Sequence, residues 1–136
     1  MTPDLMDLGR RLMALPDFEW MPGMLSVDGE RYLRRRPGAE YPHLFFDPMY
    51  DAVIDYSDAQ LKHIEPEPAD PATLGCLLAL VREKWGRPNM AATPEIIGVR
   101  VLWYVEDFTD GSESSLGLVG DTEAEALVCA LEAIPC

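Results

Sequence analysis

Four aspartates in the middle of the chain have a spacing that could do chemistry. Positions 47, 51, 55 and 58 differ by 4, 4 and 3 residues, so a helix here would carry all four carboxylates on one face: Asp47, Asp51, Asp55 and Asp58. Neighbours on such a face lie about 6 Å apart and repel one another by a few tenths of a kcal/mol. Phosphates along a nucleic-acid strand have a similar separation. The row could therefore imitate a nucleic-acid backbone and occupy a groove lined by Lys and Arg.

Two other interpretations of the row are open. A solvated helix face also carries charged residues at this spacing. Clustered carboxylates suit Ca²⁺ or Mg²⁺, but the segment lacks the glycine and the alternating spacing of an EF-hand loop. We therefore expect neither a metal nor another cofactor.

Net charge supports a basic protein as the partner. The chain has 11 basic and 24 acidic residues, a net charge of −13, which repels nucleic acid and favours cationic protein surfaces. Solubility is the simpler explanation of the same charge. The predicted partner-binding residues combine the row with nearby acids and a second acidic site: Asp47, Asp51, Asp55, Asp58, Glu65, Glu67, Glu106, Asp107 and Asp110.

Other catalytic signatures are weak or missing. His43 and His63 could act as bases beside an aspartate, but no HxH, HExxH or HxxxH pattern joins them. The GxSxG, GxGxxG and GxxxxGK[ST] motifs are absent. The three cysteines include no CxxC, so Cys76 and Cys129 are interpreted as core residues in a reducing compartment. We predict no catalytic residues.

The elements that must position these residues suit one domain, 1–136, with an acidic, proline-containing insert at 37–70. The clearest element is a helix between the capping residue Asp70 and the terminating Gly86, with Pro71 in its first turn. Taken along the whole chain, the sequence pattern predicts the order helix, hairpin, insert, helix, hairpin, helix. We expect an α+β fold, in which an antiparallel sheet of about four strands packs with three main helices.

Local signals place the other elements. Asp28-Gly29 predicts a two-residue type I′ turn, and Asp47-Pro48 predicts the start of a helix within the insert. A long interior strand is expected over 96–105, and a shorter strand over 116–119. Capping boxes begin at Ser57 and Thr122. A signal-peptide core and an apolar run of about 18 residues are both missing, so a cytoplasmic location is expected.

Two helical segments carry a resemblance. PATLGCLLALVREKWG and TEAEALVCALEAIP resemble segments of small proteins encoded by prophages and phage-like elements of proteobacteria. The matching residues are helix-forming core positions. Such a relationship implies a phage origin, in a group of small acidic proteins that includes inhibitors of host defence such as anti-CRISPR proteins.

The sequence therefore favours a non-enzymatic, acidic binding or inhibitor protein of phage origin, with an anti-CRISPR-type inhibitor as the leading example. It would occupy a basic, nucleic-acid-binding surface of a host protein, without direct contact to nucleic acid or membrane. One alternative is a small-molecule or metal-dependent enzyme that uses His43, His63 and the aspartates. Another is a self-associating phage structural or accessory protein.

Overall fold

The computed structural model describes residues 5–16, 18–107 and 114–133. Its elements, in chain order, are α1 (Leu5–Met13), β1 (Arg31–Arg35), β2 (His43–Asp47), β3 (Ala52–Tyr56), α2 (Asp58–Leu61), α3 (Pro71–Trp85), β4 (Met90–Ile97), β5 (Arg100–Asp107), β6 (Ser114–Gly120) and α4 (Glu123–Glu132). The α+β class is confirmed. None of the helices within the described ranges is both long and apolar enough to cross a membrane.

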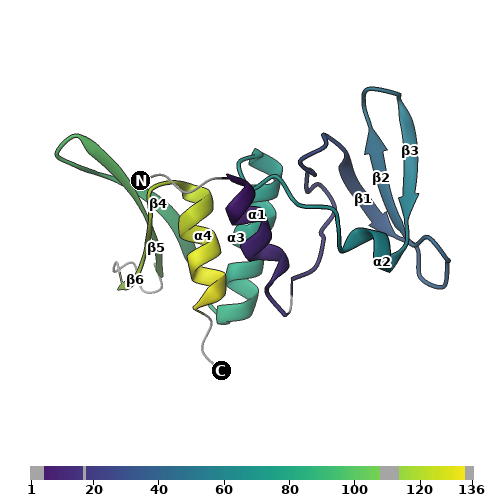
Figure 1. The fold of residues 1–136 in the computed structure, drawn as a ribbon. Coiled ribbons are helices and arrows are strands. Elements are labelled where there is room, and N and C mark those ends of the chain that lie inside the picture. The colour runs from purple at the N-terminus through teal and green to yellow at the C-terminus, as the bar shows by residue number, and fades with distance from the viewer. Residues whose placement is uncertain (1–4, 17, 108–113, 134–136) are drawn as a thin grey trace.

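Two antiparallel sheets replace the single sheet that the sequence predicts. β1-β2-β3 form one three-stranded sheet, and β4-β5-β6 form the other. The helices α1, α3 and α4 lie between them in Figure 1. One cluster of buried side chains runs from Phe45 in β2, through Leu12 and Leu77 in the helices, to Val105 in β5. The sheets therefore share a core with the helices between them.

The central helix forms where its termini were predicted. The Asp70 side chain accepts a hydrogen bond from the backbone N–H of Thr73, and Gly86 ends α3 with a left-handed φ of 65°. The capping box predicted at Ser57 is present at the start of α2. At the start of α4 the Thr122 side chain accepts from the Glu125 backbone N–H, but the Glu125 side chain accepts from the Asp121 N–H rather than that of Thr122, so only half of the predicted box forms. Hydrogen bonds within a few residues decide these termini, which explains why sequence alone located them.

The first hairpin turn differs from its prediction. Ser26 N–H donates to the carbonyl oxygen of Glu30 at 2.7 Å, which closes a three-residue loop over 27–29. Gly29 alone in this loop has positive φ (86°), so the turn is not type I′, which needs two such residues. The loop then pairs with the segment after α2, because Val27 N–H donates to the Glu65 carbonyl at 3.0 Å.

The prediction of a helix over the aspartate row, residues 47–58, is wrong. This part of the chain is a hairpin in which Phe45 faces Ile54 and Asp47 faces Ala52 across β2 and β3. Instead of capping a helix, Asp47 accepts a hydrogen bond from the Met49 backbone N–H at 2.9 Å. Asp51 then takes a left-handed φ of 48° in the turn. Such side-chain-to-backbone bonds and left-handed aspartates are typical of turns.

The long strand expected over 96–105 is likewise two strands. Ile97 pairs with Arg100, and Gly98 between them has a φ of 64°. Glycine at the first of two turn residues is the pattern of a type II′ hairpin. β4 therefore begins at Met90, before the expected start of the strand at residue 96. The strand over 116–119 is present as part of β6.

Candidate functional site

The hairpin separates the four aspartates that were expected to form a row. Asp47 lies on the same sheet face as Phe45, whereas Asp55, opposite Leu44, lies on the other face. Asp51 is exposed in the turn, and Asp58 begins α2. The structure therefore does not bring these carboxylates together on one surface.

Several of the predicted partner-binding acids already have a cationic or donor group beside them. Asp55 pairs with Arg36 at 3.3 Å, and Asp58 pairs with His43 at 2.6 Å. In the second acidic site, the buried Asp107 carboxylate pairs with Arg87 at 3.2 Å. These contacts compensate part of the negative charge that the sequence assigned to a partner.

The remaining members of the set are scattered. Glu65 lies 3.7 Å from Arg10, and Glu67 accepts a hydrogen bond from the Ala69 backbone N–H. Glu106 is buried and accepts a hydrogen bond from the Thr93 hydroxyl at 3.3 Å. Asp110 lies outside the described residues. A role for these acids in binding stays a prediction without a shared surface to support it.

His43 is the centre of a polar chain that the sequence did not predict. Its Nδ1 lies 3.1 Å from the Tyr32 hydroxyl, and its Nε2 lies 2.6 Å from Asp58 Oδ1. The hydrogen bond from His43 lowers the pKa of Asp58, while burial raises the pKa of Tyr32. Both ring nitrogens of this buried histidine are therefore engaged. The exposed His63 lies beyond α2 and takes no part in the hydrogen bonds that join Tyr32, His43 and Asp58.

A pocket of about 370 Å³ lies beside this polar chain. Its wall combines aromatic and aliphatic side chains with charged ones, among them Phe18, Trp20, Leu61, Arg34 and Arg35. His43, Tyr32 and Asp58 also line it. The pocket meets part of the expectation for the enzyme alternative, because a buried histidine and an aspartate converge there. Across the described parts of the chain, no three His, Cys, Asp or Glu side chains gather to hold a metal ion.

The hairpin of β4 and β5 carries the second candidate surface. We call residues 94–103 the arm, because this ribbon projects away from the helices in Figure 1. β6 pairs with β5 only from Trp103 onward, so the outer part of the arm is two-stranded. Ile96 is 78% exposed, and Val99 at the tip is fully exposed.

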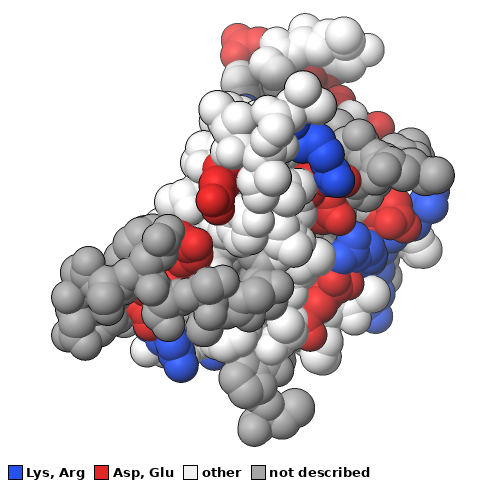
Figure 2. All heavy atoms as spheres, turned by 90° about the vertical axis from the view of Figure 1, so that its left-hand side faces the viewer, with Lys and Arg blue, Asp and Glu red and all other residues white. Residues whose placement is uncertain are grey.

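One face of the arm is apolar throughout. Side chains alternate along a strand, so Ile96 shares a face with Pro94 on β4, and the facing residues on β5 are Val101 and Trp103. The opposite face carries Glu95 and Arg100 among other residues. Figure 2 looks at this end of the molecule and shows uncharged atoms over much of its described surface, with charged side chains dispersed among them.

The sequence contained signals for the arm but none for the contacts of His43. Gly98 marks a turn, and Pro94 marks an edge strand because proline has no N–H to donate to a neighbour. Together they indicate an exposed hairpin rather than an interior strand. No sequence pattern indicated the hydrogen bonds of His43, because Tyr32 and Asp58 come together only through the pairing of β1, β2 and β3.

Comparison of the chain with models of protein families, with curated proteins and with solved structures finds no significant match.

Proposed function

We propose that this protein is a non-enzymatic binding protein that docks on another protein through the apolar face of the arm. The observation that carries the proposal is the exposure of Ile96, Val99 and Val101 on a ribbon that projects beyond the helices. A contiguous apolar surface of this kind is typical of an interaction site.

The energetics favour a covered arm. A two-stranded ribbon without a partner is only marginally stable in water. Burial of one Ile or Val side chain contributes about 1.5–3 kcal/mol, so covering three such side chains yields several kcal/mol before the cost of association. An apolar groove in the partner would supply this burial.

Charge restricts the choice of partner. The net charge of −13 attracts proteins with basic surfaces and repels acidic ones, so the groove should be rimmed by Lys or Arg. The resemblance to phage-encoded proteins directs the search to bacterial host proteins, including nucleic-acid-binding defence complexes. Inhibition of such a complex would follow from occupation of its basic surface.

The test compares the wild type with an arm variant, Ile96→Ser/Val101→Ser. A partner captured from a bacterial lysate is purified, and its dissociation constant is measured by biolayer interferometry. We expect the double variant to bind at least about tenfold more weakly, because each lost apolar contact costs about 1 kcal/mol or more.

The matched control is Val53→Ser. Val53 is also an exposed β-strand valine, but it belongs to the other sheet. Its substitution should leave binding unchanged. Equal affinity of the wild type and the arm variant would refute the proposal. Dimerisation of the purified protein that depends on the arm would also refute it, because the partner would then be a second copy of the chain.

A further inference from the structure

We propose that the pocket beside His43 binds a small organic anion, an aromatic phosphate or carboxylate. The aromatic wall would take the ring of this ligand, and Arg34 and Arg35 would take its charge. The pocket belongs to the β1-β2-β3 sheet, at the opposite end of the molecule from the arm in Figure 1, so this proposal is independent of the docking proposal.

A β-bulge in β1 aims the second arginine at the pocket. Tyr32 faces Phe45 and Arg34 faces Leu44, so Leu33 is an extra residue in β1. Residues three apart in a regular strand point to opposite faces, and one extra residue cancels this alternation. Arg35 consequently faces His43 and shares the pocket side of the sheet with Tyr32.

The two arginines are available to a ligand. Arg36, the third of the run, is held by Asp55 and by the Tyr41 carbonyl. Arg34 and Arg35 are exposed and have no hydrogen bond or ion pair with any residue that the structure describes. Arg35 stands on the pocket face of the sheet, opposite His43, whereas Arg34 is paired with Leu44 and lines the pocket from the edge of β1. Each guanidinium group offers paired N–H donors, which suit the oxygens of a phosphate or carboxylate.

The pocket wall contains two carboxylates, Asp58 and Glu19, beside the two guanidinium groups. Asp58 is engaged by His43, which leaves Glu19 as the one other carboxylate in the wall. The apolar part of the wall, Phe18, Trp20 and Leu61, suits a planar hydrocarbon ring. A ligand with a ring at one end and an anionic group at the other matches both parts.

His43 holds the pocket wall in place rather than offering a free nitrogen to a ligand. Both of its ring nitrogens are engaged by groups of the protein, the Tyr32 hydroxyl and Asp58, so direct proton transfer between His43 and a ligand would first require one of these hydrogen bonds to break. The chain instead fixes the pocket wall, since buried polar groups with satisfied hydrogen bonds hold a single arrangement.

The test uses three probes that share a benzene ring: phenyl phosphate, benzyl alcohol and phenethylamine. Each is titrated into the ¹⁵N-labelled full chain, and the indole N–H signal of Trp20 is followed by NMR. We expect saturable shifts with phenyl phosphate and at least tenfold weaker binding of the neutral and cationic probes. Inorganic phosphate should also bind more weakly, because it lacks the ring.

Arg34→Ala and Arg35→Ala should each raise the dissociation constant for phenyl phosphate about tenfold, the usual effect of losing a charged hydrogen bond. Lys84→Ala is the control, because it removes one positive charge from α3 without touching the pocket. The exposed arginines are not core residues, and retained NMR spectra of the variants will verify their folding. Unsaturable shifts, equal binding of the three probes, or unchanged affinity in both arginine variants would overturn the proposal.

Discussion

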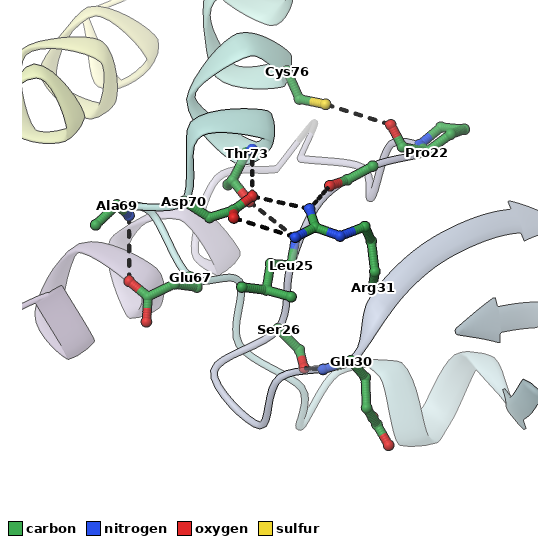
Figure 3. A network of polar contacts seen from close by, with 11 residues as sticks. Pro22, Leu25, Ser26, Glu30, Arg31, Glu67, Ala69, Asp70, Thr73 and Cys76 are labelled. Carbon is green, nitrogen blue, oxygen red and sulfur yellow. Dashed lines mark hydrogen bonds and ion pairs between the residues drawn. The ribbon is translucent and has the colours of Figure 1, made fainter. Parts of the chain in front are cut away.

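An ion pair between Arg31 and Asp70 connects β1 to the start of α3 (Figure 3), and we predict that Asp70→Ala destabilises the whole molecule. Asp70 accepts hydrogen bonds from Arg31 through both carboxylate oxygens, at 3.1 and 3.3 Å. Arg31 also donates to the Gly23 carbonyl at 2.7 Å, and the Thr73 hydroxyl accepts from the Leu25 N–H at 3.0 Å. The network therefore holds the 23–25 segment and the helix to one another.

The size of the effect has two parts. Loss of the capping hydrogen bond, in which Asp70 accepts from the Thr73 backbone N–H, costs about 1 kcal/mol. Loss of the hydrogen bonds to Arg31 costs about 1–2 kcal/mol, at the low end for charged groups because the Arg31 side chain is 40% exposed, against 11% for Asp70. The sum of about 2–3 kcal/mol corresponds to a lower melting temperature by roughly 6–15 °C for a domain of this size.

Urea denaturation, followed by circular dichroism, measures this free energy, and Asp70→Asn is the matched variant. Asparagine caps helices as well as aspartate does, so this variant should lose only the ionic part, about 1 kcal/mol. Burial alone would raise the pKa of Asp70, but the hydrogen bonds from Arg31 and Thr73 hold it below its ordinary value. A lowered pKa in the folded state contributes stability that is present above the unfolded pKa of about 3.9 and is lost as the pH falls through the folded pKa.

The difference between the wild type and Asp70→Asn should therefore shrink as the pH falls below about 4. Two results would refute this account. One is a loss in Asp70→Ala no larger than in Asp70→Asn, which would mean that the cap contributes nothing. The other is a double-mutant cycle with Arg31→Ala that gives additive losses, since a real pair should show coupling of about 0.5 kcal/mol or more.

Three further predictions concern single residues. Gly120→Ala should cost about 1–3 kcal/mol in urea denaturation, because the new Cβ would lie 2.6 Å from the Ala126 backbone nitrogen; an unchanged midpoint would contradict this packing. Tyr56→Phe should cost about 1–3 kcal/mol, because the hydroxyl donates to both oxygens of the buried Glu30. Burial and this contact raise the pKa of Tyr56 to about 12, so wild-type stability should fall between pH about 10 and about 12, and fall less in the variant. Burial raises the pKa of Cys76, so iodoacetamide should modify it more slowly at pH 8 than it modifies a cysteine in a short peptide, as followed by mass spectrometry.

Helix termini were predictable because their signals are local. Asp70 bonds to a backbone group three residues away, and Gly86 needs only its own freedom to adopt positive φ. The same holds for the Ser57 capping box. Each of these signals is complete within one turn of chain and does not depend on what the helix packs against.

Strands were less predictable because pairing partners are distant. The segment 43–58 contains aspartates at helical intervals, yet Phe45 and Ile54 gain more by facing each other across a hairpin. The interval of the aspartates was accidental with respect to the fold. The apolar run over 96–102 suggested burial, because the hydrophobic pattern of an exposed interaction surface is the same as that of a core strand.

The proposed docking has two stages, a long-range attraction between charges and a later contact between apolar surfaces. Charge acts over roughly 10 Å at 0.1 M salt, so the net charge of −13 can steer a basic partner before contact. Apolar contacts act only when surfaces touch, so the arm would determine how long the complex lasts. Since Asp55, Asp58 and Asp107 already have partners within the molecule, their carboxylates are poorly suited to the final contact. The acidic residues would then govern the rate of association, and the uncharged arm would govern the rate of dissociation.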